Sequence, residues 1–168
     1  MQEENIDFQA AIKQFVEGNV RFVLIGGLAM IAQGATHTTL DIDLSYDRNT
    51  ENLAALVKVL VGCHARLRNV PADLPFILDV KTFRNVFNLT LTTDVGAIDL
   101  LAEPAGVDSF EGLWERASVM ELFGMSVRVA SIEDLIAMKR AAGRPKDERH
   151  LMELLDLQQF LRDEAEKK

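Results

Sequence analysis

Three aspartates have the type and spacing to hold a metal ion. Asp41 and Asp43 lie two residues apart in the segment LDIDLS, residues 40–45, which alternates apolar and polar side chains as a strand does. Their carboxylates therefore point to one face of the strand, where two negative charges repel each other. A divalent cation between them removes that repulsion, and Mg²⁺ prefers oxygen ligands of this kind. The alternative is an edge strand that presents two solvated aspartates.

Asp99 is the third candidate ligand. It lies in the segment AIDLL, between Ile98 and Leu100. An acidic residue inside an apolar strand needs a partner or a metal, because removing a lone charge from water is costly. The alternative is an aspartate at a strand end that accepts a hydrogen bond from a nearby amide. Three strand carboxylates beside a phosphate site would indicate two-metal phosphoryl transfer.

The pair Gly26-Gly27 is the candidate phosphate site. It ends an apolar segment predicted as a strand, residues 20–25, and precedes the short predicted helix LAMIAQ, which ends at Gly34. Glycine lets backbone amides approach a ligand closely, and a helix N-terminus favours an anion. The pair lies fourteen residues before Asp41. The alternative is a tight turn from strand to helix that binds nothing.

Helices and strands must bring these residues together. We predict an α/β (α+β) fold, with a mixed β-sheet flanked by helices and with C-terminal helices. Residues 1–168 are expected to form a single domain, with its C-terminal helical part at about 131–162. The predicted helices are 8–17, a segment capped by Asn49 or Thr50, 109–117, 131–142, and one from Pro145 to about 161 before a frayed tail. The predicted strands are 20–25, 40–45, 75–80, 86–92, 97–102 and a hairpin within 119–130 that turns at Phe123-Gly124.

Composition narrows the classes of protein that fit. The net charge of −8 argues against broad, sequence-blind binding to the backbone of nucleic acid. No apolar run is long enough to predict a membrane span, and the acidic start lacks the features of a signal peptide. The single cysteine, Cys63, is expected to be a core residue, and a chain without disulfides suits the cytoplasm. A local basic patch could still hold an RNA end, with these candidates: Lys81, Arg84, Lys139, Arg140, Arg144, Lys146 and Arg149.

Two segments carry a family resemblance. The stretch FVLIGGLAMIAQGATHTTLDIDLS resembles the signature of the DNA polymerase β-like nucleotidyltransferase superfamily, in which a Gly-Gly or Gly-Ser turn precedes a D-x-D strand. The closest likeness is to the bacterial AbiEii and MNT-like group, with G-G-x-A and then G-x-x-R-x-T-x-D-I-D. The later stretch EDLIAMKRAAGRPKDERHLMELL resembles that group's closing motif, a helical Lys followed by Arg-x-Lys-Asp.

The resemblance implies a role for each matching position. Asp41, Asp43 and Asp99 would be catalytic and would hold Mg²⁺ or Mn²⁺, and Asp99 would also help to activate the attacking hydroxyl. The implied nucleotide-binding residues are Gly26, Gly27, Thr39, Lys139 and Asp147. Gly26 and Gly27 would cradle the triphosphate, Lys139 would contact phosphate or base, and Asp147 would orient Lys139.

One position departs from the group's pattern. His37 replaces the usual Arg, which is always charged and binds phosphate through a fork of donors. Histidine is mostly neutral near pH 7, so nucleotide affinity would be weaker or the site would serve another purpose.

The resemblance implies an enzyme that moves a nucleoside monophosphate from a nucleoside triphosphate to a hydroxyl acceptor. The acceptor would be a protein side chain, an RNA end such as that of tRNA, or a small molecule, and the setting would be toxin–antitoxin or phage defence. The second hypothesis is a catalytically weak or inactive module that binds a partner protein, such as a cognate toxin or antitoxin. A metal-dependent nuclease also fits three carboxylates, but the glycine turn and the order of the motifs disfavour it.

Overall fold

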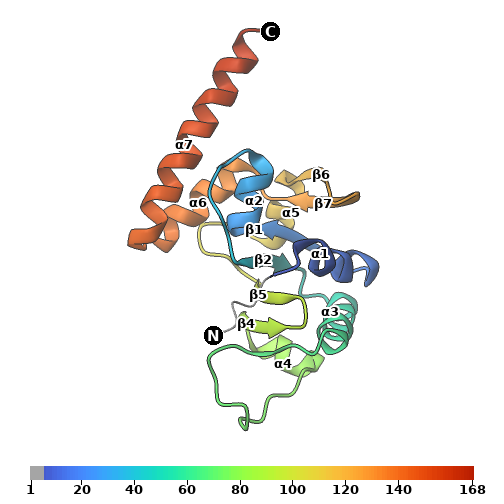
Figure 1. The fold of residues 1–168 in the computed structure, drawn as a ribbon. Coiled ribbons are helices and arrows are strands. Elements are labelled where there is room, and N and C mark those ends of the chain that lie inside the picture. Colours follow the sequence, from blue (N-terminus) through green and yellow to red (C-terminus); the bar gives the residue numbers. More distant parts are fainter. Residues whose placement is uncertain (1–5) are drawn as a thin grey trace.

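A mixed sheet of seven strands forms the centre of the computed structural model, which describes residues 6–168 (Figure 1). The strands lie in the order β3-β4-β5-β2-β1-β7-β6. The bounds of the strands are β1 Phe22–Ile25, β2 Asp41–Tyr46, β3 Arg66–Leu67, β4 Asn88–Thr93, β5 Gly96–Leu101, β6 Ser118–Leu122 and β7 Met125–Val129. The bounds of the helices are α1 Phe8–Glu17, α2 Gly26–Gln33, α3 Thr50–Gly62, α4 Val80–Asn85, α5 Phe110–Arg116, α6 Ile132–Ala142 and α7 Pro145–Glu166. The predicted mixed sheet with flanking and C-terminal helices is confirmed.

Several helices begin and end at the signals visible in the sequence. Asn49 caps α3 by accepting a hydrogen bond from the backbone N–H of Asn52 at 2.8 Å, and Ser131 caps α6 through the N–H of Asp134 at 3.1 Å. Gly34 and Gly143 end α2 and α6 in the left-handed conformation, with φ of 116° and 59°. In the described part of the chain, no helix is long and apolar enough to cross a membrane.

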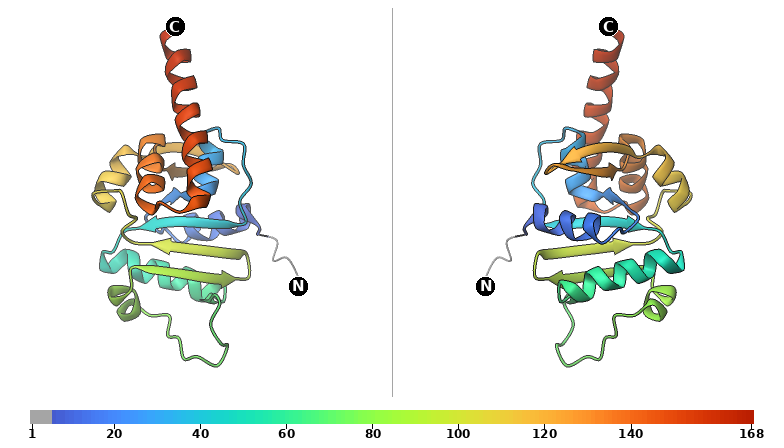
Figure 2. Two further views of the ribbon diagram at one scale, coloured as in Figure 1. Left: turned by 90° about the vertical axis from the view of Figure 1, so that its left-hand side faces the viewer. Right: turned by 90° about the vertical axis from the view of Figure 1, so that its right-hand side faces the viewer.

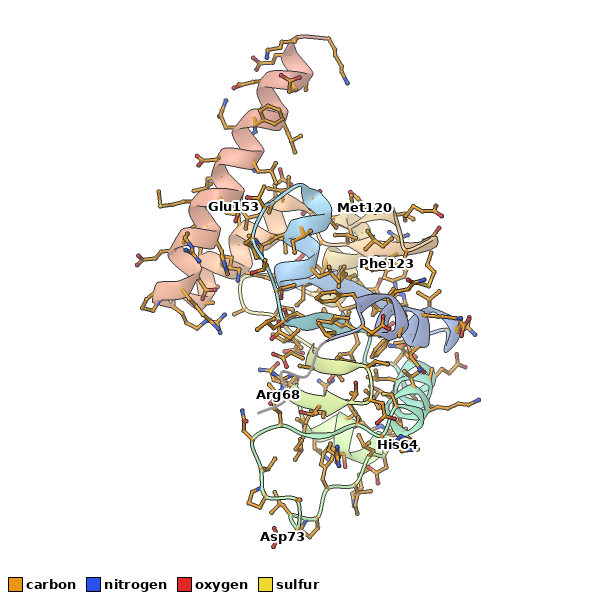
Figure 3. The ribbon with its side chains drawn as sticks, viewed as in Figure 1. His64, Arg68, Asp73, Met120, Phe123 and Glu153 are labelled. Carbon is orange, nitrogen blue, oxygen red and sulfur yellow. The ribbon has the colours of Figure 1, made fainter. Side chains whose placement is uncertain are left out.

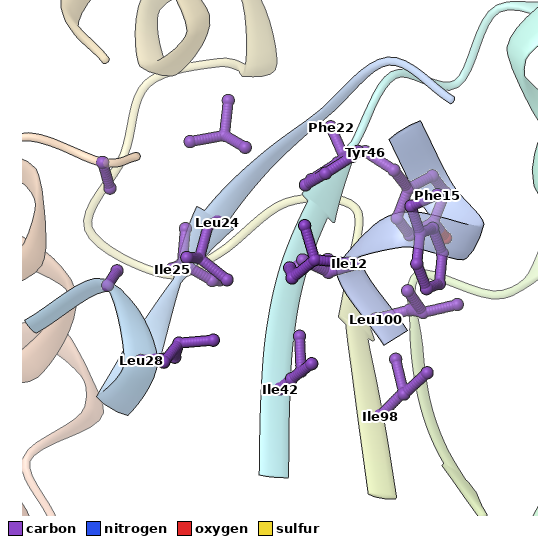
Figure 4. Close-up of a cluster of buried hydrophobic side chains, with 14 of the residues drawn as sticks. Ile12, Phe15, Phe22, Leu24, Ile25, Leu28, Ile42, Tyr46, Ile98 and Leu100 are labelled. Atoms are coloured by element: carbon purple, nitrogen blue, oxygen red, sulfur yellow. The ribbon is translucent and has the colours of Figure 1, made fainter. Parts of the chain in front are cut away.

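Much of the apolar core lies between helices α1 and α3 and one face of strands β2, β5 and β4. Figure 2 shows α1 and α3 on the same side of strands β2, β5 and β4, and the left view shows the other face of these strands with none of the described helices in front. Ile42 of β2 and Ile98 of β5 are fully buried on the covered face, next to Ile12 and Phe15 of α1 (Figure 4). Because side chains alternate along a strand, the aspartates between these residues point to the uncovered face.

The prediction of a strand at residues 75–80 is wrong. Residues 68–79 form a long irregular connection, and Figure 3 places Asp73 at its far tip. Asp79 instead caps α4, accepting a hydrogen bond from the N–H of Thr82 at 2.7 Å. The apolar residues that suggested a strand stay near solvent, with Ile77 68% exposed. The short strand β3, which precedes this connection, was not predicted.

Smaller differences occur elsewhere. The hairpin turn at Phe123-Gly124 is confirmed, with both residues at positive φ. The tail predicted to fray is helical, because α7 continues to Glu166 and projects away from the sheet (Figure 1). Cys63 is 2% exposed and belongs to the core, as predicted.

Candidate functional site

The three aspartates converge on the uncovered face of the sheet. Strands β2 and β5 pair in parallel, and the register sets Asp43 directly beside Asp99 and Asp41 beside Ala97. One carboxylate oxygen from each of Asp41, Asp43 and Asp99 can be chosen so that all three lie within 4.8 Å of one another. Neighbouring residues of paired strands point to the same face, so this convergence follows from the register.

Crowded charge perturbs two of these carboxyl groups. Burial, followed by the negative charges of Asp41 and Asp99, raises the pKa of Asp43 to about 7. The positive charge of Lys139 and the backbone N–H of Gly27 oppose that rise. Burial also raises the pKa of Asp99. A bound cation would favour the charged form of both groups.

The Gly26-Gly27 turn lies against Asp43 and admits no larger residue. Gly26 has φ of +66°, and a Cβ there would lie 2.1 Å from Oδ2 of Asp43. A Cβ on Gly27 would lie 2.8 Å from the side chain of Thr39. Helix α2 begins at Gly26, so the N–H groups of its first turn face the carboxylate cluster without a side-chain cap. This corner has the geometry of an anion site.

Thr39 orients one of the carboxylates. Its hydroxyl donates a hydrogen bond to Oδ1 of Asp41 at 3.1 Å, and it also lies 3.2 Å from the backbone carbonyl of the same residue. Thr39 is therefore close enough to act on the site through Asp41.

A cavity of about 500 Å³ joins the carboxylates to the glycine turn and the C-terminal helices. Its size lies within the range of small-molecule sites. It is lined by Ile25, Gly26, Gly27, His37, Thr38, Thr39, Asp41, Asp43, Asp99, Leu101, Pro104, Ala105, Leu135, Met138, Lys139, Ala142, Arg144, Lys146 and His150. Of the seven cations proposed as a basic patch, Lys139, Arg144 and Lys146 line this cavity. Lys81 and Arg84 lie on α4 and do not.

Lys139 is held in the cavity wall by Asp147. Its Nζ lies 3.0 Å from Oδ1 of Asp147, and Nε of Arg144 lies 2.6 Å from Oδ2. Burial opposes ionisation of Asp147, but the hydrogen bonds from Arg144 and Lys139 outweigh it and bring the pKa to about 2. Asp147 is 1% exposed and does not line the cavity, so it acts through the two cations.

Arg68 is a site residue that the sequence did not reveal. Its Nη2 donates to Oδ1 of Asp99 at 2.7 Å and to the backbone carbonyl of Leu91 at 2.8 Å. Figure 3 shows Arg68 beside the sheet, at the start of the long connection. No motif contains Arg68, and only the pairing of β3 with β4 brings it to the carboxylates.

His37, the departure from the family pattern, stacks on His150. Their ring centroids lie 4.7 Å apart, and Oε2 of Glu153 lies 3.3 Å from Nδ1 of His37. Glu153 also accepts the backbone N–H of Thr36 at 2.6 Å. This contact ties the loop before β2 to α7 and places both imidazole rings on the cavity wall.

The donor set fits a hard divalent cation. All three groups offer carboxylate oxygens, which suit Mg²⁺ or Mn²⁺ rather than softer metals. Burial, together with the charges of Asp41 and Asp99, raises the pKa of Asp43, and a cation bound there would offset both effects. The arrangement can therefore bind such a cation and, beside the glycine turn, a phosphate group.

The fold recurs in solved structures. The lincosamide antibiotic adenylyltransferase LnuA, bound to lincomycin, aligns with a TM-score of 0.60 and 14% identity over 91% of this chain and 99% of its own. ANT(2'')-Ia in complex with adenylyl-2''-tobramycin aligns with a TM-score of 0.56 and 16% identity over 89% and 84% of the two chains. No curated protein sequence matches. Residues 5–159 match the family described as nucleotidyltransferase of unknown function (DUF6036). The chain therefore belongs to this family of nucleotidyltransferases.

Proposed function

We propose that the protein is a metal-dependent nucleotidyltransferase that moves a nucleoside monophosphate from a nucleoside triphosphate to a hydroxyl acceptor. The convergence of Asp41, Asp43 and Asp99 beside the Gly26-Gly27 turn carries this proposal. Family membership supports the class of reaction.

The side chains divide the work of that reaction. Asp41 and Asp43 would hold Mg²⁺ or Mn²⁺, which would neutralise charge on the phosphates, and the hydrogen bond from Thr39 keeps Asp41 in place. The N–H groups at Gly26 and Gly27 bind phosphate oxygens. Lys139, fixed by Asp147, adds positive charge on the opposite wall. Asp99 completes the metal site and accepts the proton of the attacking hydroxyl. Positioning and electrostatic stabilisation then supply the catalysis.

The acceptor and the biological setting are the finer parts of the proposal. The AbiEii and MNT-like sequence pattern supports a cytoplasmic toxin–antitoxin or phage-defence role, with a protein side chain or tRNA as acceptor. The similar folds of LnuA, bound to lincomycin, and of ANT(2'')-Ia, in complex with adenylyl-2''-tobramycin, support a small-molecule acceptor instead. In either case we propose that residues 1–168 act as one domain.

A module that binds a partner without turnover is the second candidate. Arg68 occupies one oxygen of Asp99, and His37 stands where the related group has arginine. Both features would suit a site that has lost its chemistry, with a cognate toxin or antitoxin as the bound partner.

Two measurements on wild type and Asp43→Asn separate the candidates. The first is the melting temperature with and without millimolar nucleoside triphosphate and Mg²⁺ or Mn²⁺. A ligand at a hundredfold excess over its Kd stabilises the folded state by about 2.7 kcal/mol. The second is transfer of label from each triphosphate to candidate acceptors.

For an enzyme, we expect a clear stabilisation of wild type and a fall in transfer of about a hundredfold or more in the variant, because the reacting phosphate is misplaced. If none of the four triphosphates stabilises wild type with either metal, the proposal that the protein is an enzyme is refuted. A module without turnover would transfer no label in either protein.

A further inference from the structure

The sheet face that carries the aspartates continues beyond them, away from the glycine turn. The register sets Asp41 beside Ala97, Ala97 beside Thr92, and Thr92 beside Arg66. These four residues form one row across β2, β5, β4 and β3 and point to the same face. Strand β1, which leads into the glycine turn, lies on the opposite side of β2.

A second hollow lies over this extension, with a volume of about 740 Å³. It meets the first cavity at Asp41, which lines both. The small side chains of Ala97 and Thr92 form its floor, and the connection after β3 forms its outer wall. The hollow is large enough for a drug-sized molecule, and no helix of the described chain covers this face in Figure 2.

The lining of this hollow combines apolar surface with positive charge. Leu40 is 82% exposed, Leu74 is 50% exposed and Val70 is 37% exposed, all at its rim. Arg66 and Arg68 are its two cations, and Asp41 is the one acidic residue of its lining. Exposed apolar side chains at a concave site indicate a ligand with an apolar body. Two guanidinium groups favour a carboxylate or phosphate on that ligand.

The geometry points to this hollow as the acceptor site, and to a small hydroxyl compound with an apolar body and an acidic group as the acceptor. This inference rests on the proposed nucleotidyl transfer. With the triphosphate held at the glycine turn and Lys139, an in-line attack on the α-phosphorus must come from the other side of the carboxylates. Among the described residues, the hollow over Ala97 and Thr92 lies on that side.

The step is balanced within the site. The hydroxyl oxygen of the acceptor forms a bond to the α-phosphorus. The bond from that phosphorus to the bridging oxygen breaks, and pyrophosphate leaves with the electron pair. The hydroxyl proton passes to Asp99. Arg66 binds the acidic group of the acceptor. Arg66 and Asp41 lie at the two ends of one row across the sheet, and the length of that row sets the distance between the acidic group and the reacting hydroxyl.

Two probes of similar size and opposite charge test the class of acceptor. Both para-hydroxyphenylacetate and tyramine carry a phenolic hydroxyl on an aromatic ring, and they differ in the charged group. Binding is measured by ligand-detected NMR on the full chain without nucleotide. Transfer is measured with labelled ATP and Mg²⁺. The variants are Arg66→Glu, at the exposed edge of the hollow, and Arg162→Glu on α7 as a matched control.

We expect the anionic probe to bind about tenfold more tightly than tyramine, the effect of one charge-assisted contact. Arg66→Glu should remove this preference, and Arg162→Glu should keep it. Stabilisation by ATP and Mg²⁺ should be equal in all three proteins, because Arg66 does not line the nucleotide cavity. Label should appear on para-hydroxyphenylacetate in wild type and fall at least tenfold in Arg66→Glu.

Equal binding of the two probes, or an equal loss in both variants, would overturn the inference. Binding of the anionic probe without transfer, in a protein that ATP and Mg²⁺ stabilise, would show that the hollow is not the acceptor site. If a short RNA competes for the hollow and accepts the label instead, the small-molecule class is wrong. Loss of stabilisation by ATP and Mg²⁺ in wild type would mark failure of the proposed function itself, since that readout does not involve the probes.

Discussion

Replacing Asp43 with Asn should stabilise the metal-free protein, and more so at higher pH. Burial and the neighbouring negative charges give Asp43 a pKa of about 7, against an ordinary value of 3.8. The folded state therefore holds a proton that the unfolded chain has released, and folding loses stability as pH rises between about pH 4 and pH 7. Each pKa unit corresponds to about 1.36 kcal/mol, so the full effect is about 4 kcal/mol.

Only part of that effect falls within the pH range in which stability can be measured. Between about pH 5 and pH 8, wild type should lose about 2 kcal/mol at this residue, after a discount for the partial exposure of Asp43 and its coupling to two carboxylates. Asn does not titrate, so the advantage of the variant over wild type should grow by that amount. Asp156→Asn, an exposed aspartate on α7, is the control and should show no such growth.

The assay is urea unfolding in a chelator at about pH 5 and about pH 8, which compares the free energies of unfolding. Saturating Mg²⁺ should reverse the order at the higher pH, because wild type then gains binding energy that the variant lacks. A difference between variant and wild type that stays constant with pH would refute the charge-crowding account. So would a variant less stable than wild type at about pH 8 without metal.

Three further substitutions test the surroundings of the site. Gly26→Ala should lower the free energy of unfolding by about 2–4 kcal/mol and abolish stabilisation by triphosphate, because its Cβ would clash with Asp43. Gly124→Ala has a similar φ but open space around it, so it should lose only about 1–2 kcal/mol to backbone strain. Equal losses of stability in thermal melts would contradict the clash with Asp43. Asp147→Asn should destabilise by about 2–3 kcal/mol near pH 7 in urea unfolding. The difference should shrink as pH falls from about pH 4 to about pH 2, because the unfolded wild-type chain takes up a proton there while folded Asp147 stays ionised; a difference that stays unchanged at low pH would contradict this. Arg68→Gln removes the positive charge that pairs with Asp99, so it should lower the metal-free stability by about 1–2 kcal/mol. The same change should tighten Mn²⁺ binding in calorimetry, because Mn²⁺ no longer competes with Arg68 for Asp99. Weaker Mn²⁺ binding would show instead that Arg68 supports the metal site.

Local patterns were enough to predict most of the fold. The alternation in LDIDLS and the caps at Asn49 and Ser131 are short-range signals, and each corresponds to an element of the structure. The segment 75–80 misled because its apolar residues have strand-like composition. Asp79 can cap a helix there, and the sheet ends on that side with the two-residue strand β3, so residues 75–80 pair with no strand. Pairing partners are a property of the whole sheet, which a local pattern does not contain.

The candidate site also has residues that local sequence patterns identified and contacts that they did not. The glycine turn, Asp41 and Asp43 belong to one contiguous stretch, and Asp99 is conspicuous as an acidic residue in an apolar strand, so all could be named as candidates; the register then showed that the three aspartates meet. Arg68 reaches Asp99 across thirty-one residues of sequence, and the contact between Thr36 and Glu153 spans one hundred and seventeen. Such contacts depend on β3 pairing and on the path of α7. Neither the pairing of β3 nor the path of α7 produces a recognisable pattern of residues in the sequence.

The ion pairs of Asp147 and that of Asp99 differ in burial, and this difference suggests which cation a metal ion would displace. Asp147 is 1% exposed and accepts hydrogen bonds from both Lys139 and Arg144, so releasing either cation would leave a buried charge underpaired. Arg68 and Asp99 keep 25% and 20% of their side-chain surface exposed, and their contact can exchange with water at lower cost. Lys139 is thus a fixed element of the cavity wall. Arg68 is the cation that a metal ion at Asp99 would displace, and its release would free the charge of a guanidinium group that already lines the hollow beside Asp41. Metal binding would then prepare both halves of the site, since the same carboxylate that receives the metal frees the arginine.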